Sequence, residues 1–298
     1  MKSLFKNMST GDRLFNVINV LVMCLIALVI LYPLYFVVIA SVTDPNIVNR
    51  GGILLYPKEL YLSGYKKILE YTPIWRGYWN SIIYTVAGTT LNIILTITAG
   101  YVLSRRDLFG RNIIMFIFVF TMFFNGGLVP TYLTVSYLGI LDTVWAMILP
   151  TAASVFNIIL TRTFFQSTIP GELLEAARMD GCSDFKFFFH IVLPLSKVII
   201  AVMVLFYGVQ HWNSFFEALI YLNTDTKYPL QIILRNLIIM NETSTEMISD
   251  PGTLAERQRT AEQLKYGIIV VASLPLLVLY PFLQKYFTQG VMIGSIKD

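Results

Sequence analysis

The sequence predicts an all-α, polytopic membrane protein with six transmembrane helices. Of its 298 residues, 56% are hydrophobic and only 13% are charged, whereas a soluble domain carries about 25% charged residues. The apolar residues also gather in charge-free runs of about 20 residues or more, long enough to cross a hydrocarbon core as helices. This composition excludes an ordinary soluble enzyme and a disordered protein. The net charge of +4 without a basic tract argues against nucleic-acid binding.

Six charge-free runs place the spans along the chain, and they hold 30, 28, 30, 19, 19 and 19 residues. The first run is too long for the apolar segment of a cleaved signal peptide, so we expect it to remain as an anchor. The third run contains Gly126-Gly127 and Pro130, which interrupt a helical pattern. We expect one membrane domain, residues 1–298, with spans at about 15–42, 80–104, 112–130, 143–161, 197–216 and 266–284.

The distribution of basic residues predicts the orientation of the chain. The loop between spans two and three carries three arginines, whereas the short loop after span three, residues 131–142, carries no Lys or Arg. Because Lys and Arg in short loops stay in the cytoplasm, we expect the first loop and both termini to be cytoplasmic. The basic residues are Arg105, Arg106 and Arg111 in the loop and Lys2, Lys6 and Arg13 in the N-terminal tail.

The sequence lacks the motifs of several kinds of chemistry. It has no G-x-x-x-x-G-K-[ST] phosphate loop, and its two histidines and two cysteines form no metal-binding pattern. Cys24 and Cys182 lie far apart in sequence, so we expect no disulfide. No acidic residue occurs at mid-depth in a span, and only His211 is a candidate for ion coupling, with a satisfied histidine as the alternative. A secondary carrier, a channel and a membrane-embedded enzyme are therefore less favoured hypotheses.

The loop between spans four and five, residues 168–194, has the local signals of a short helix followed by a second one. Pro170 suits a first helical turn, and Glu172 favours the positive end of the helix dipole. Gly181 suits a left-handed C-terminal cap, and Ser183 can then cap the next helix. Within the first helix, Ala176 and Ala177 offer a slim face to a partner, although a partnerless interfacial helix is an equal alternative.

This loop resembles the EAA loop of binding-protein-dependent ABC importers. Its pattern is Glu175-Ala176-Ala177, three residues, Gly181, nine residues, and then Ile191-Val192-Leu193-Pro194. The pattern matches at every position, in a cytoplasmic loop of a six-span chain. The resemblance implies the type I ABC importer permease fold. It also implies a coupling helix that contacts an ATPase, with these residues as the contact set: Glu175, Ala176, Ala177, Asp180, Gly181, Leu193 and Pro194.

Other segments resemble the carbohydrate-importing branch of these permeases. The resemblance is strongest to the second, maltose-type permease of importers for complex oligosaccharides. An importer for another solute, such as peptides or phosphate, is the nearest alternative. The matching segments are Asn80-Ser81, Tyr101-x-x-Ser104-Arg105, Asn125–Tyr132, Leu138-Gly139, Trp145 and the tail Gly290–Lys297.

The resemblance implies a heteromeric importer in a bacterial cytoplasmic membrane. This chain would pair with a second, different permease in the lipid bilayer, and two cytoplasmic ATPase subunits would bind ATP and Mg²⁺. An extracellular solute-binding protein would deliver the oligosaccharide. The chain itself would then be a transport subunit and no enzyme, without a catalytic residue, cofactor or metal of its own.

Two segments are candidates for the sugar path, because sugars are held by hydrogen bonds and apolar or aromatic faces. Span five ends in a polar cluster, and span three is broken at a point where interrupted helices can line a cavity. Trp212 as an interfacial anchor and Asn125 as a partner of a neighbouring helix are the alternatives. The candidate path residues are Asn125, Tyr132, Gln210, Trp212 and Asn213.

Overall fold

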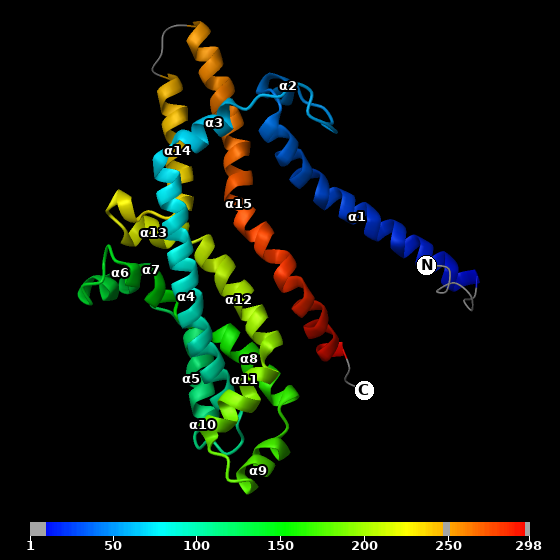
Figure 1. Ribbon diagram of the computed structural model, residues 1–298, viewed down its shortest axis with the longest axis vertical. Coiled ribbons are helices and arrows are strands. Elements are labelled where there is room, and N and C mark those ends of the chain that lie inside the picture. The colour runs from blue at the N-terminus through cyan, green and yellow to red at the C-terminus, as the bar shows by residue number, and fades with distance from the viewer. Residues whose placement is uncertain (1–9, 247–250, 296–298) are drawn as a thin grey trace. The chain divides into compact units, whose positions relative to one another are not determined.

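The computed structural model describes residues 10–246 and 251–295, and it is all-α in those ranges apart from one antiparallel bridge between Thr43 and Leu60 (Figure 1). The expected fold class is therefore confirmed. Side chains are described for residues 11–239, 259–282 and 284. Lys2, Lys6 and the two chain ends lie outside the described residues, and the orientation of the chain stays a prediction.

The chain divides into two compact units, and the first comprises Met1–Tyr71 with Leu237–Ser273. Its N-terminal helix includes the apolar stretch Gly11–Val42, whose most apolar window has a mean hydropathy of 2.8 and contains no residue that is buried within the chain. A helix that is apolar on every side needs lipid or another chain around it. The helices of this unit are α1 (Thr10–Val42), α2 (Pro45–Asn49), α3 (Ser63–Glu70) and parts of α14 (Leu230–Glu246) and α15 (Pro251–Ser295).

A buried polar centre holds the first unit together. Arg259 on α15 forms an ion pair with Asp44, the residue that caps α2, and its guanidinium lies 4.5 Å from the ring centroid of Tyr61. Gln263, which is fully buried, accepts a hydrogen bond from the Gly64 amide at 2.7 Å and donates one to a backbone carbonyl of α1. Each buried polar group thus has a partner, as burial requires.

The second unit comprises Thr72–Asn236 with Leu274–Asp298. Its centre is α4, which packs most extensively against α12 and α8. Helix α4 ends at Ser104, where the expected second span ends. It begins at Thr72, before the expected start at residue 80, because its first turns include Arg76 and precede the charge-free run. The helices of this unit include α4 (Thr72–Ser104), α5 (Arg111–Phe123), α6 (Leu128–Tyr137), α7 (Val144–Ile148), η1 (Leu149–Thr151), α8 (Val155–Thr168), α9 (Gly171–Met179), α10 (Asp184–Phe187), η2 (Phe188–Val192), α11 (Leu193–Leu195), α12 (Lys197–Trp212), α13 (Phe215–Tyr221) and η3 (Asp225–Lys227).

Three of the apolar stretches are bent pairs of helices. Helices α5 and α6 meet at 111°, the α7–η1 segment and α8 at 55°, and the α10–α11 segment and α12 at 75°. The structure therefore has three long apolar helices, or up to six spans if each bent pair counts as one, among the described residues. The number of membrane spans remains a prediction, since length and composition alone support it.

A hydrogen-bonded chain of side chains fixes α4, α12 and the break before α8. His211 on α12 bonds Asn92 on α4 at 2.9 Å, and Asn92 donates to the carbonyl of Thr151 at 2.6 Å, which lies at the break. Gly88 allows this approach, because a Cβ there would overlap the His211 imidazole. His211 is buried and satisfied, which supports the structural interpretation of this histidine over an ion-coupling one.

Candidate functional site

Helix α9 has well-formed ends. Pro170 lies one position before the helix, which begins at Gly171, so it is the cap rather than the first helical residue. Gly181 has φ +72° and donates to the carbonyl of Arg178 at 3.0 Å, while the amide of Cys182 donates to the carbonyl of Ala177 at 2.9 Å. This pair of bonds is a Schellman motif. The expected left-handed cap at Gly181 is confirmed.

The two alanines of α9 face different surroundings. Ala177 is buried in a cluster with Phe165 of α8 and Phe187 of α10. Ala176 is exposed, and its neighbours Leu173 and Met179 are 41% and 89% exposed. Ala177 therefore attaches α9 to the rest of its unit. The exposed face of α9, which we call its open face, contains Leu173, Ala176 and Met179 but not Ala177.

The segment after α9 carries the other residues of the EAA pattern. Ser183 accepts a hydrogen bond from the amide of Lys186 and caps α10, as its sequence position predicts. The helix then continues as a π-turn, η2, before Pro194, which has no amide proton to donate to the preceding turn. Leu193 packs against the buried cluster around Phe187, whereas Pro194 is exposed.

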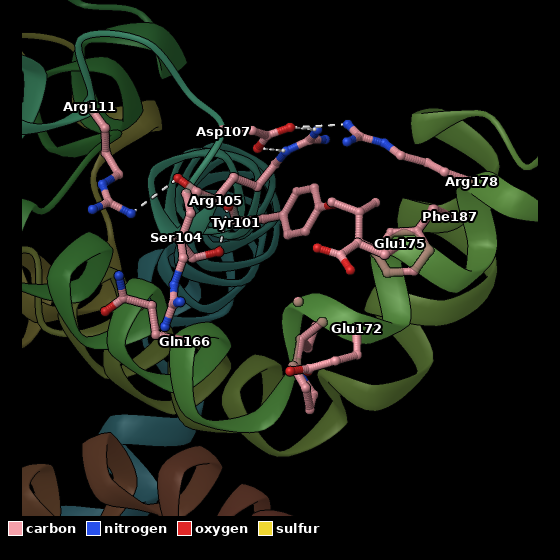
Figure 2. Close-up of a pocket in the computed structure, with 15 residues that line it drawn as sticks. Tyr101, Ser104, Arg105, Asp107, Arg111, Gln166, Glu172, Glu175, Arg178 and Phe187 are labelled. Carbon is pink, nitrogen blue, oxygen red and sulfur yellow. Dashed lines mark hydrogen bonds and ion pairs between the residues drawn. The ribbon is translucent and has the colours of Figure 1, made fainter.

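A pocket of about 750 Å³ lies between α9, the end of α8 and the loop that joins α4 to α5. Figure 2 shows Arg111 and Gln166 on one wall and Glu172 and Glu175 on the other. Glu175 is exposed and forms no ion pair with the described residues. The pocket therefore holds carboxylates next to the open face of α9. Among the described residues, no group of three His, Cys, Asp or Glu side chains could hold a metal ion.

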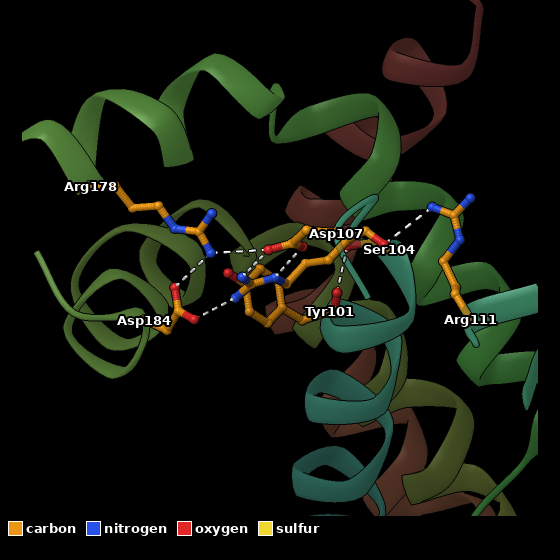
Figure 3. Close-up of polar contacts among 7 residues, drawn as sticks. Tyr101, Ser104, Asp107, Arg111, Arg178 and Asp184 are labelled. Atoms are coloured by element: carbon orange, nitrogen blue, oxygen red, sulfur yellow. Dashed lines mark hydrogen bonds and ion pairs between the residues drawn. The ribbon is translucent and has the colours of Figure 1, made fainter. Parts of the chain in front are cut away.

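Four charged side chains form a ring at the edge of this pocket, which we call the ion ring: Arg105, Asp107, Arg178 and Asp184 (Figure 3). Arg105 donates to Asp107 at 2.6 Å and pairs with Asp184 at 3.1 Å. Arg178 on α9 donates to Asp107 at 3.0 Å and lies 3.6 Å from Asp184. The ion ring thus joins the α4–α5 loop to the end of α9 and the start of α10.

The electrostatics of the ion ring favour its charged form. Hydrogen bonding to Arg105 holds the pKa of Asp107 well below its usual range, and Arg178 adds to this effect. Hydrogen bonding to Asp107 likewise raises the pKa of Arg105. The side chains of Asp107, Arg178 and Asp184 are nevertheless 44–52% exposed, so solvent weakens each pair.

At the opposite end of α4, a second polar cluster, which we call the outer clamp, joins two loops through Asp142. This residue has φ +55°, and its carboxylate accepts bonds from the amides of Asn223 and Thr224 at 3.0 and 3.1 Å. The Thr224 hydroxyl and the Lys227 ammonium bond the other carboxylate oxygen at 2.6 and 2.7 Å. Hydrogen bonding to Lys227, followed by Thr224, lowers the pKa of Asp142 far below its usual range.

The structure separates the five candidate path residues into two groups. Asn125 lies in the turn between α5 and α6, where its side-chain oxygen accepts the amide of Gly127 at 3.0 Å. Tyr132 follows on α6 and stacks on Tyr221, with ring centroids 6.4 Å apart. Asn125 is thus occupied by its own turn, which is a third role besides path lining and contact with a neighbouring helix.

The second group lies at the end of α12. Gln210 is exposed, while Trp212 is 4% exposed and packs on Tyr78 of α4. Asn213 is exposed; its amide donates to the carbonyl of Val209, and its oxygen faces Gln231 of α14 at 3.5 Å. Gln210 and Asn213 thus offer polar groups to solvent here, whereas Trp212 is a packing residue.

Two sets of polar residues at these sites were not predicted from the sequence. The charges of the ion ring are far apart in sequence, and no spacing rule connects Asp107 with Arg178. Gln231 and Arg235 on α14 share a helix face through their i, i+4 spacing, which is a readable signal. It was missed because α14 lies outside the expected spans.

The comparisons with known proteins agree with one another. Residues 3–293 match the family described as binding-protein-dependent transport system inner membrane component. The chain is 41% identical to the polygalacturonan/rhamnogalacturonan transport system permease protein YtcP of Bacillus subtilis (strain 168), covering 96% of this chain and 99% of that one. It is 39% identical to Protein LplC of the same organism, with 96% of each chain covered.

One solved structure is similar over almost its whole length. It is the crystal structure of a bacterial ABC transporter involved in the import of the acidic polysaccharide alginate. The matched chain is 33% identical to this one with a TM-score of 0.81, and the match covers 94% of this chain and 99% of that one.

Proposed function

Because the chain belongs to the family of binding-protein-dependent transport system inner membrane components, we propose that it is the permease subunit of an ATP-driven importer for an oligosaccharide. In this role it is a transport subunit in the membrane and not an enzyme. Both termini and α9 face the cytoplasm in the proposed arrangement, in agreement with the arginines of the α4–α5 loop.

The geometry of α9 is the observation that carries the proposal. A short helix, closed by a Schellman motif at Gly181 and attached inward through Ala177, presents Leu173, Ala176 and Met179 outward. An exposed apolar face, here next to carboxylates that form no ion pair with any described residue, is typical of a surface that another protein covers. We propose that a cleft on an ATPase subunit covers this face, with Glu175 and Asp180 at its polar rim.

The partners follow from what this chain lacks. It has no phosphate loop of its own, so two ATPase subunits bind ATP and Mg²⁺ in the proposed importer. Helix α1 buries no residue of its most apolar window within the chain, which is consistent with contact to a second permease and to lipid. A solute-binding protein delivers the sugar from outside.

The substrate class rests on the relatives. The names of the matched proteins refer to polygalacturonan, rhamnogalacturonan and alginate, which are all polymers of sugars. The polar end of α12, with Gln210 and Asn213 exposed, offers amides of the kind that bind sugar hydroxyls. We therefore propose an oligosaccharide derived from such a polymer as the cargo, with this end of α12 in its path.

The proposal is tested by reconstitution of the chain with a second permease, ATPase subunits and a solute-binding protein of the same importer. Proteoliposomes should accumulate a labelled oligosaccharide only when ATP and the binding protein are both present. Vesicles with an ATPase that cannot hydrolyse ATP are the control. Accumulation without ATP, driven by an ion gradient, would contradict the importer and favour a secondary carrier.

A further inference from the structure

One charged residue, Arg235, lies on the apolar stretch Leu230–Ile239 of α14. Its side chain is exposed, and among the described residues no carboxylate forms an ion pair with it. The charged groups described above, by contrast, are mostly paired within the ion ring or the outer clamp. Arg235 is therefore an exposed cation without a carboxylate partner among the described residues, and it lies one turn after Gln231, which contacts Asn213 at the end of α12.

The guanidinium of Arg235 is held in place by an aromatic ring. Its central carbon lies 5.4 Å from the centroid of Phe215, the first residue of α13. A cation over a ring face is stabilised by the ring quadrupole. The contact restricts the side chain while the N–H groups that do not face the ring remain free to donate. Arg235 is thereby positioned for a ligand before any ligand arrives.

Two side-chain amides, those of Gln231 and Asn213, lie near Arg235. Gln231 is one turn before Arg235 and therefore shares its helix face, and its side chain reaches Asn213 at the end of α12 at 3.5 Å. The first turn of α14 is fixed in turn, because the amide of Leu230 donates to the Ser81 hydroxyl of α4 at 2.9 Å. Two contacts thus join α14 to the end of α12 and the start of α13: the side-chain amide of Gln231 contacts Asn213, and the guanidinium of Arg235 contacts the ring of Phe215. These four side chains form one surface.

This surface has the chemistry of an acidic sugar site. A guanidinium binds a carboxylate through two parallel hydrogen bonds, which an ammonium or an amide cannot reproduce. The amides of Asn213 and Gln231 can bond the hydroxyl groups of the same ring. A neutral sugar would leave the guanidinium without an anionic partner.

We propose that Arg235, supported by Phe215 and flanked by Asn213 and Gln231, binds the carboxylate of a uronic-acid residue and selects acidic over neutral oligosaccharides. The inference rests on the proposed importer function and narrows its substrate class. Two of the matched proteins are consistent with it, since the name of one refers to polygalacturonan and the description of the other to an acidic polysaccharide.

The test compares two sugars of equal length in the complete reconstituted importer. One is trigalacturonate, and the other is the same trisaccharide with its carboxylates reduced to alcohols. Uptake of each is measured at saturating binding protein for the wild type, Arg235→Gln and Arg235→Lys. Arg76→Gln is the matched control, because Arg76 on α4 is also exposed and forms no ion pair within the described part of the chain.

We expect Arg235→Gln to lower trigalacturonate uptake about ten-fold or more, the loss expected for one charge-assisted contact, and to leave uptake of the neutral sugar unchanged. Trigalacturonate uptake by Arg235→Lys should lie between that of the wild type and that of Arg235→Gln, and Arg76→Gln should behave as the wild type. An unchanged preference for the acid in Arg235→Gln overturns the inference. Wild-type vesicles that import only the neutral sugar overturn it as well, while the importer stands. If neither sugar is taken up in an ATP-dependent way, the proposed importer function itself is contradicted.

Discussion

The ion ring and the outer clamp both join loops through a carboxylate whose pKa is lowered, yet they are built differently. The ion ring contains only side chains, and three of its four members are 44–52% exposed. In the outer clamp, Asp142 is 24% exposed and accepts bonds from two backbone amides as well as from Lys227. Exposed side-chain pairs contribute little to stability, whereas bonds to a less exposed carboxylate contribute more.

The difference indicates different tasks for the two ends of the second unit. The outer clamp fixes the backbone of Asn223 and Thr224 to the Asp142 carboxylate and so holds the two loops at that end together. The ion ring connects α9 to the α4–α5 loop through contacts that can exchange partners at little cost. An element that transmits motion from an ATPase benefits from such adjustable contacts, and an element that supports a sugar path benefits from fixed ones.

The largest effect is expected at the cap of α9. Gly181→Val places a β-branched residue at φ +72°, where only glycine and asparagine are well tolerated. We expect the variant to remain in the membrane but to lose most ATP-dependent uptake, because α9 no longer ends in its present geometry. Gly181→Asn, which tolerates this backbone conformation, should retain uptake. Normal uptake in Gly181→Val would remove the requirement for this cap.

The next effect concerns the outer clamp. Asp142→Ala removes four hydrogen bonds from one carboxylate and should destabilise the protein by about 2 kcal/mol, the usual range for bonds to a charged group. The melting temperature in detergent measures this loss. Asp142→Asn keeps part of the acceptor capacity and should lose less. If both variants melt as the wild type does, the clamp has no stabilising role.

A pH series sharpens the same point. The folded pKa of Asp142 lies below its unfolded value, so its stabilising contribution is complete above the unfolded pKa of about 4 and is lost as pH falls below it. The stability difference between the wild type and Asp142→Asn should therefore shrink as pH falls from 5 to about 3. A difference that stays constant over this interval would contradict the electrostatic origin of the clamp.

The smallest stability effect is expected at the ion ring. Asp107→Asn should change the free energy of unfolding by less than about 1 kcal/mol, the usual limit for exposed ion pairs, yet it should reduce the uptake gained per ATP hydrolysed. Asp107→Glu keeps the negative charge between Arg105 and Arg178 and should retain most of the coupling. A large loss of stability in Asp107→Asn would make the ion ring structural instead.

Much of this architecture could be predicted from the sequence, because apolar runs and caps are local signals. The first expected span ends at Val42 and the second at Ser104, as α1 and α4 do, and Gly181 and Ser183 have the expected caps. Gly126-Gly127 also predicted the break that the structure has between α5 and α6, but the angles of the three bends could not be predicted. The 111° angle between α5 and α6 has no local signal in the sequence, because charge counting gives only the length of a run.

The candidate sites show the same difference between local signals, which the sequence contains, and contacts between distant segments, which it does not. The EAA pattern located α9, but local spacing gave no indication that Ala177 packs inward on Phe165 and Phe187 while Ala176 stays open. Asn125 looked like a polar group available for a ligand, yet it bonds the amide of Gly127 two residues away. Contacts between distant segments, such as Arg178 with Asp107 or Arg235 with Phe215, depend on the fold and cannot be read from the pattern of one segment.

The central claim is that the open face of α9 binds an ATPase subunit, and co-purification tests it most directly. Ala176→Arg places a long charged side chain on this face, while Phe109→Arg makes a comparable change at a 98% exposed residue of the α4–α5 loop. We expect the ATPase subunits to co-purify with the wild type and Phe109→Arg and to be lost from Ala176→Arg, with all three chains present equally in the membrane. Full retention of the ATPase by Ala176→Arg, together with normal uptake, would contradict the account.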